Sequence, residues 1–169
     1  MRFITFGLLV FLSAAGIARA DFAEPLSLPA ADKILVVKSE RRLFLYRGPE
    51  VLRSYRVSLG LNPRGHKERE GDYRTPEGLY RLSKRNSRSA FFLSIKISYP
   101  APSDIAWAKA NRWPVGGSIM IHGLPNNPSH SEQYYATTDW TNGCISLSNA
   151  DMLELWSLVD RQAIIEIKP

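Results

Sequence analysis

The 169-residue sequence has a single cysteine, Cys144, and it lacks acidic runs, polar low-complexity segments and internal repeats of solenoid-like period. A single cysteine has no partner for an internal disulfide, and no segment has the composition of extensive disorder. Hydrophobic residues make up 44% of the chain, an ordinary value for a protein that buries a core. These features predict one compact domain.

The sequence also lacks a cluster of metal ligands and a glycine-rich phosphate loop. Those two patterns are the usual signatures of a bound metal ion and of a bound nucleotide. We therefore expect no metal and no cofactor.

The first twenty residues have the pattern of a secretory signal peptide. Arg2 supplies a positive charge, residues 3–17 form a mostly apolar stretch without charge, and Ala-Arg-Ala at 18–20 fits a cleavage site before Asp21. An uncleaved membrane anchor is the alternative, but a span needs about 20 apolar residues. No cysteine follows the cleavage site to carry a lipid anchor. We expect an exported protein of the periplasm or cell envelope.

Loss of residues 1–20 removes Arg2 and Arg19 and no acid, so the formal net charge falls from +6 to +4. A basic protein first suggests nucleic acid, which an exported domain rarely meets. An anionic wall polymer or a membrane surface fits better, although a solvated surface without a specific partner explains single charges equally well.

Hydrophobic alternation and turn residues predict a mainly β fold after a proline-containing linker at 21–31. The expected strands cover 34–37, 43–46, 51–58, 79–82, 91–98, 118–122 and 163–167. A short helix is expected at 105–111 and a clearer one after the capping box at 148–151, with Met152, Trp156 and Val159 in the core. Residues 60–78 are expected to form an exposed charged loop, and 124–140 a long functional loop.

Exported proteins generally pair their cysteines, so the lone Cys144 indicates intermolecular pairing, a reactive thiol or a buried inert thiol. Thiol catalysis needs a base and donors for the developing oxyanion. His122 ends a predicted strand and could be that base, with a satisfied core histidine as the alternative. His66 and His130 lie in polar loops and are expected at the surface.

Four segments together resemble the YkuD-type L,D-transpeptidase catalytic domain. They are Ile121-His122-Gly123 with the later run 143–149 (Gly-Cys-Ile-Ser-Leu-Ser-Asn), the run 75–78 (Thr-Pro-Glu-Gly), and Tyr99-Pro100. The likeness covers roughly residues 32–168.

The resemblance implies a catalytic domain at 32–169, with a β-sandwich or barrel fold and one or two short helices. It implies that Cys144 attacks a peptidoglycan stem peptide at the L-centre of the diamino acid and expels the terminal D-alanine, with His122 as base. The thioester then passes to an amine or to water. The backbone amides of Gly143 and Cys144 are candidate oxyanion donors, with Asn142 and Gly123 in support. Tyr99 and Ser146 are candidate substrate-binding residues, and so is Arg74, as a replacement for a cation that the family pattern has at position 146.

Two positions depart from the family pattern. Asn142 stands where many members have histidine, and it cannot act as a base near neutral pH. Ser146 stands where many members have arginine, so a cation for a substrate carboxylate is lost there. The form Trp-Thr-x-Gly-Cys-Ile resembles a Gram-negative branch in which some members cleave linkages.

Three interpretations follow from these features. The first is a monomeric transpeptidase acting on stem peptides. The second is a hydrolase of the same chemistry, acting as an L,D-carboxypeptidase or on a link to a wall-anchored lipoprotein. The third is a wall-binding module without turnover.

Overall fold

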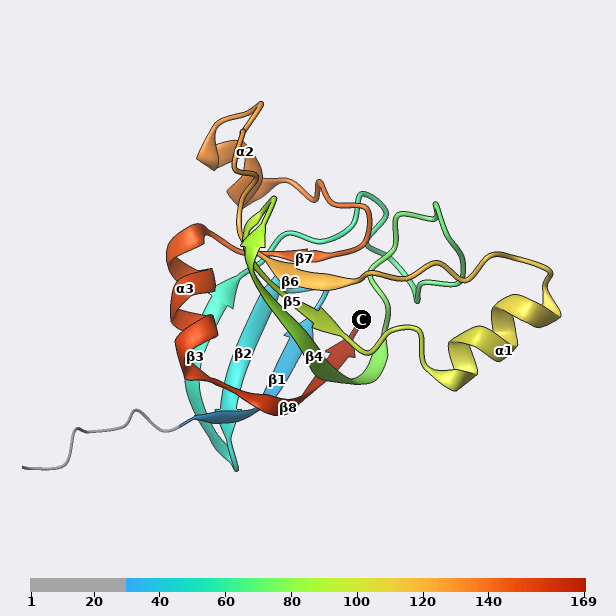
Figure 1. Cartoon of the computed structure of the whole chain (residues 1–169), viewed down its shortest axis with the longest axis horizontal. Coiled ribbons are helices and arrows are strands. Elements are labelled where there is room, and N and C mark those ends of the chain that lie inside the picture. Colours follow the sequence, from blue (N-terminus) through green and yellow to red (C-terminus); the bar gives the residue numbers. More distant parts are fainter. Residues whose placement is uncertain (1–29) are drawn as a thin grey trace, which may run out of the picture.

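The computed structural model describes residues 30–169, so the expected signal peptide and nearly all of the linker lie outside the described residues. Strands dominate this part of the chain, and the expected mainly β fold is confirmed (Figure 1). The strands are β1 (Ala31–Val37), β2 (Arg42–Arg47), β3 (Glu50–Arg56), β4 (Gly78–Ser89), β5 (Phe92–Ile97), β6 (Met120–His122), β7 (Ile145–Ser146) and β8 (Val159–Lys168). The helices are α1 (Pro102–Ala110), α2 (Glu132–Thr137) and α3 (Asn149–Leu158). No helix in the described range is long and apolar enough to cross a membrane.

The eight strands form one sheet in the order β3-β2-β1-β8-β4-β5-β6-β7. The last strand, β8, lies near its centre, parallel to β1 and antiparallel to β4. The two ends of the sheet meet, because Ser58 after β3 exchanges two backbone hydrogen bonds of 2.9 and 2.8 Å with Ser146 of β7. The sheet therefore curls back on itself like a barrel.

The hydrophobic core fills the inside of this curled sheet. Ile34 and Val36 of β1 and Leu43 and Leu45 of β2 are fully buried, while the residues between them are not, which is the two-residue period of a half-buried strand. Helix α3 covers the core beside β5. It begins at the predicted capping box, where Ser148 Oγ accepts a hydrogen bond of 3.1 Å from the Asp151 amide.

Several elements differ from the prediction, among them β7, which was not expected, and β8, which begins at Val159, a residue expected on the helix. Strand β4 continues to Ser89, although the pattern predicted a strand only at 79–82, because residues 83–89 are mostly polar and pair with β5 in an exposed hairpin. Helix α2 lies inside the expected loop 124–140, capped by Ser131. A helix of six residues is too short to show a helical period in the sequence.

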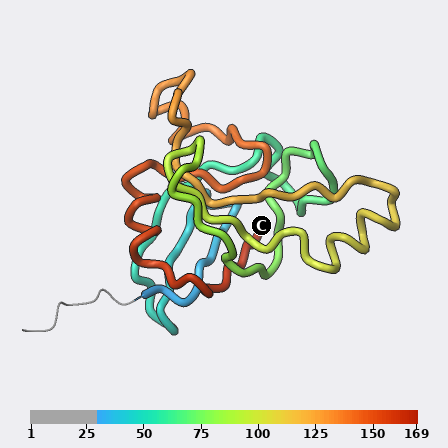
Figure 2. Tube along the Cα trace, in the orientation of Figure 1, coloured from blue at the N-terminus to red at the C-terminus, as the bar shows by residue number. Residues whose placement is uncertain are grey.

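Segments 60–78 and 101–118 project from the same side of the sheet (Figure 2). They contact each other, since the Glu70 amide donates a 2.7 Å hydrogen bond to the Pro114 carbonyl. The guanidinium of Arg69 also lies 5.6 Å from the centre of the Trp113 ring. The two segments together flank the end of the sheet at which β6 begins.

Truncation of a central core side chain should be costly. Ile165→Ala on β8 removes a fully buried side chain and should lower the free energy of unfolding by about 2–5 kcal/mol. Ile105→Ala on α1, where the side chain is 49% exposed, is the matched control and should change it by less than about 0.5 kcal/mol. Denaturant unfolding measures both, and equal effects would contradict this description of the core.

Candidate active site around Cys144

Cys144 lies in a tight turn that directly precedes β7. Thr141 closes this turn, because its Oγ1 donates to the Cys144 carbonyl at 2.7 Å and accepts from the Gly143 amide at 3.1 Å. Gly143 has φ +123°, and a Cβ there would lie 2.6 Å from the Arg74 carbonyl oxygen. Only glycine fits such a backbone. The turn thus presents the thiol from a fixed backbone.

His122 lies beside this turn at the end of β6. The parallel pairing of β6 with β7 sets His122 against Ser146, and the His122 carbonyl accepts a 2.9 Å hydrogen bond from Leu147. The His122 ring is 4% exposed, with Nδ1 2.7 Å from the Gly123 carbonyl oxygen. A carbonyl can only accept, so Nδ1 carries the hydrogen, and in the neutral ring Nε2 keeps its lone pair.

His122 and Cys144 line one pocket of about 280 Å³ whose surface is largely apolar. Phe91 and Trp140 flank the imidazole, with ring centres 4.7 and 5.6 Å from it. The remaining lining residues are Ser89, Ser94, Ser118, Met120, Thr141 and Asn142. The pocket therefore holds a thiol and an imidazole together in largely apolar surroundings.

Burial favours the neutral form of both groups. It raises the pKa of the Cys144 thiol, while the Met120 backbone and the charge of Lys67 act in the opposite direction. It lowers the pKa of His122 against the raising effect of the hydrogen bond to Gly123. The thiol donates to the Ser118 carbonyl across 3.7 Å. The resting site is thus a thiol and a neutral imidazole, and the imidazole can accept the thiol's proton.

Gly123 supports His122 from behind. Its carbonyl accepts from His122 Nδ1 and, at 3.4 Å, from the Ser146 hydroxyl. Its amide donates to the carbonyls of β5 and of the residue preceding that strand. A Cβ at Gly123 would lie 2.5 Å from Asn149 Oδ1 and 3.0 Å from Phe92 Cβ, so no side chain fits there.

The structure brings together some of the predicted site residues and not others. Cys144, His122 and Asn142 share the pocket. Arg74 and Tyr99 do not line it: the Arg74 guanidinium bonds Glu68 at 3.1 Å, and the Tyr99 hydroxyl donates to a backbone carbonyl within the core. The side chain of Ser146 faces the Gly123 carbonyl behind the histidine, outside this pocket.

The other two histidines lie elsewhere. His66 Nε2 is 3.1 Å from the buried carboxylate of Asp104, and His130 is exposed and stacks on Tyr134. Neither lines the pocket that holds Cys144. Sequence reasoning did not single out Phe91 and Trp140 as site residues. The position of Trp140, four residues before the cysteine, was the one available signal.

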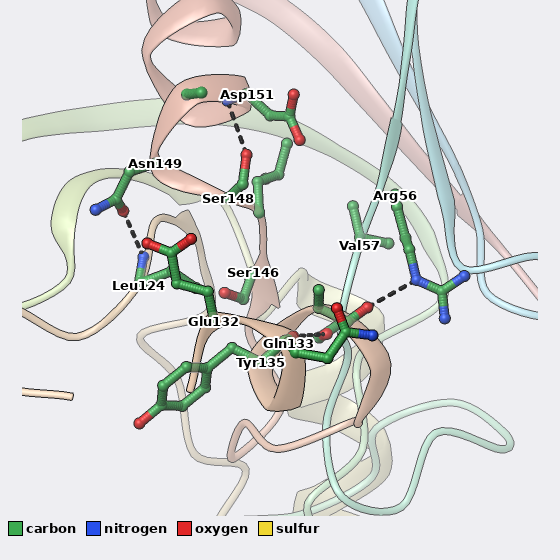
Figure 3. Close-up of a pocket in the computed structure, with 14 residues that line it drawn as sticks. Arg56, Val57, Leu124, Glu132, Gln133, Tyr135, Ser146, Ser148, Asn149 and Asp151 are labelled. Atoms are coloured by element: carbon green, nitrogen blue, oxygen red, sulfur yellow. Dashed lines mark hydrogen bonds between the residues drawn. The ribbon is translucent and has the colours of Figure 1, made fainter. Parts of the chain in front are cut away.

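A larger pocket of about 360 Å³ lies between α2 and the first turn of α3 (Figure 3). Ser146 lines it, together with Ser148, Asn149 and Tyr135, but Cys144 and His122 do not. The Arg56 side chain there donates to the Ala136 carbonyl at 2.7 Å. The larger pocket contains neither Cys144 nor His122, so the smaller pocket is the candidate for thiol chemistry.

Comparisons with known proteins point to one family. Residues 31–167 match the family model YkuD, described as the L,D-transpeptidase catalytic domain. The Escherichia coli K12 protein named "Putative L,D-transpeptidase YafK" is 30% identical over 96 residues, which cover 53% of this chain and 37% of that protein. The chain thus matches only about a third of that relative's length.

Solved structures show the same fold. The helical cell shape determining protein Pgp2 from Campylobacter jejuni is 24% identical with a TM-score of 0.59, covering 85% of this chain and 51% of that one. Bd1075 from Bdellovibrio bacteriovorus is 23% identical with a TM-score of 0.55, covering 83% and 51%.

The protonation state predicts how Cys144 responds to pH. Its alkylation by iodoacetamide should keep accelerating beyond about pH 9, the ordinary thiol value, because the folded thiol ionises less readily. Intact mass measured over time reports the rate, and the lone cysteine makes the site unambiguous. A rate that is already constant between about pH 5 and 7 would instead mean a preformed thiolate–imidazolium pair.

Proposed function

Because the chain belongs to the YkuD family of L,D-transpeptidase catalytic domains, we propose that it forms a thioester between Cys144 and a peptidoglycan stem peptide. The observation that carries the proposal is the shared pocket of Cys144 and His122, in which the imidazole offers an unprotonated Nε2. An exported protein, as the first twenty residues predict, would meet this substrate in the cell envelope.

The acylation half-reaction begins with proton transfer from Cys144 Sγ to His122 Nε2. The sulfur attacks the carbonyl carbon at the L-centre of the diamino acid and forms a tetrahedral intermediate. As that intermediate collapses, the C–N bond to the terminal D-alanine breaks. His122 returns the proton to the departing amine, and the thioester remains. The bond from Nδ1 to the Gly123 carbonyl stabilises the imidazolium that exists between the two transfers.

The oxyanion needs hydrogen-bond donors within this turn. The Gly143 amide already donates to Thr141 Oγ1. Among the hydrogen bonds of the described residues, the Cys144 amide donates to none. The Cys144 amide is therefore the primary candidate, and the Gly143 amide would contribute after the Thr141 hydroxyl moves. Asn142, exposed at the mouth of the pocket, is a candidate for contacts to the substrate backbone.

Deacylation repeats these steps with a second nucleophile. His122 removes a proton from an amine or from water, the new bond to the acyl carbon forms, and the thiol regains its proton as the C–S bond breaks. An amine of a second stem peptide gives a cross-link, an amine of a wall-anchored protein gives an attachment, and water gives a shortened peptide.

Substitutions at the two reactive residues should have different effects. Cys144→Ala should abolish the mass increase of the acyl-enzyme with a stem tetrapeptide or a carbapenem. His122→Gln should slow acylation by roughly 10²–10⁴-fold, the usual contribution of a general base. His130→Gln is the matched control because this histidine is exposed and outside the pocket, and it should retain the wild-type rate. Full acylation of the Cys144→Ala protein would end the proposal.

The acylation rate should fall only at low pH, where the His122 imidazole becomes protonated. Burial lowers the pKa of His122 below its ordinary value of 6.5, so the imidazole stays an unprotonated base under mildly acidic conditions. Single-turnover acylation rates measured from about pH 4 to 8 should therefore fall only below about pH 6.5. A midpoint above pH 7 would show that the imidazole is not the buried group described here.

The products identify the acceptor. Wild-type enzyme incubated with a defined tetrapeptide stem should give a cross-linked dimer if an amine accepts the acyl group, or a tripeptide if water does. Mass spectrometry separates these outcomes. Binding to purified sacculi with an unreactive Cys144 would favour the non-catalytic module instead.

A further inference from the structure

Lys67 is a buried cation in a loop whose other charged side chains are more exposed. Its side chain is 4% exposed, and its Nζ lies 2.7 Å from Asp72 Oδ1 and 3.0 Å from the Arg69 carbonyl oxygen. An ammonium has three N–H donors. The third has no partner among the hydrogen bonds of the described residues, so Lys67 can donate one more.

This lysine lines a second pocket of about 280 Å³ beside the first. Asn142 lines both pockets, so they meet two residues before the nucleophile. The rest of the second pocket is formed by Glu70, Gly71, Tyr73, Gly116 and Gly117. Its surface is more polar than that of the Cys144 pocket, and Lys67 is the only lysine or arginine among the described residues that line either one.

Asp72 holds the Lys67 ammonium in place and occupies only one of its three N–H donors. The Asp72 carboxylate also accepts the backbone amides of Glu68, Arg69 and Arg74, at 2.8, 3.1 and 3.0 Å. Four donors therefore satisfy this carboxylate and fix the position of the ammonium. The carboxylate that opposes an incoming anion is that of Glu70, an exposed residue on the pocket lining.

We propose that Lys67 binds a carboxylate of the stem peptide in the pocket that adjoins the Cys144 site. This inference rests on the proposed function and names a recognition group for its substrate. A buried ammonium with an unused donor forms a short charge-assisted hydrogen bond with a carboxylate. The pockets meet at Asn142, so a peptide whose scissile carbonyl lies at Cys144 can extend a carboxylate toward Lys67.

Two carboxylates of the peptide could occupy this pocket: that of the terminal D-alanine and that at the D-centre of the diamino acid. Three probes separate them: the free tetrapeptide and two versions in which one or the other carboxyl is an amide. Binding is measured by calorimetry in the Cys144→Ala background, where no turnover occurs. The assay therefore does not depend on thioester formation.

The test variant is Lys67→Met with Asp72→Asn, because the single change would leave the Asp72 carboxylate buried and unpaired. It should weaken binding of the free peptide by about 10–100-fold, the usual effect of losing a hydrogen bond to a charged group. Amidation of the recognised carboxyl should weaken binding to the protein that retains Lys67 by a similar factor. The variant should then bind that amide with no further loss.

A matched control separates recognition from loop anchoring. Lys38 is also buried and anchors the same loop through the Gly65 and Thr75 carbonyls and Glu77, but it does not line the pocket. Lys38→Met with Glu77→Gln should therefore change the affinity by less than about 3-fold. Three results would each overturn the assignment. The test variant could lose equal affinity for all three peptides, it could keep the affinity of the protein with Lys67, or the control could bind as weakly as the test variant. Failure of the proposed function would appear separately, as a Cys144 enzyme that binds the peptide without acylation.

Discussion

The short parallel pairing of β6 with β7 is the interaction on which the active site depends. It sets His122 against Ser146, and thereby brings the turn before β7, which carries Cys144, to the pocket of the imidazole. Strands of two and three residues cannot hold such a register alone. The backbone bonds between Ser58 and Ser146 supply the missing support by closing the curled sheet. The catalytic geometry is thus a consequence of barrel closure.

The pocket determines the protonation state of the pair it contains. Removing an ion pair from water costs more than a single short contact returns unless further hydrogen bonds compensate. Beside Phe91 and Trp140 such compensation is sparse, so the thiol and the imidazole both stay neutral. In the proposed reaction Cys144 therefore depends on His122 to remove its proton, in contrast to enzymes in which a stable thiolate exists beforehand.

Much of the fold could be predicted from local patterns. β-Branched residues located the strand around Ile34, a short apolar run located the strand around Leu43, and the capping box at Ser148 located the start of α3. The polar end of β4 carries no such hydrophobic pattern, since neither of its faces is deeply buried there. Sheet order and the Ser58–Ser146 closure depend on contacts between distant segments, and no local pattern encodes them.

The candidate site was also only partly predictable, because local motifs indicate some of its residues and contacts between distant segments place the others. The motif pointed to Cys144 and His122, which the structure brings to one pocket, and it also suggested Arg74, whose guanidinium bonds Glu68 instead. Lys67 was not identified because its neighbours in the sequence are charged and turn-forming, which indicates a solvated loop. Its burial arises only when Asp72 folds back on it.

The loop 60–78 packs against the turn that carries Cys144 and lines the pocket beside the candidate site. Thr75 Oγ1 accepts the Gly60 amide at 3.1 Å, and the Leu61 amide donates to the Thr141 carbonyl at 2.9 Å, so the loop is bonded to itself and to the nucleophile turn. The Arg74 carbonyl lies so close to Gly143 that a side chain there is excluded. The loop that contains buried Lys67 is thus the same loop whose Arg74 carbonyl requires glycine at position 143. The loop packs directly against the turn, and two buried lysines bond it in place: Lys67 within the loop, and Lys38, which follows β1.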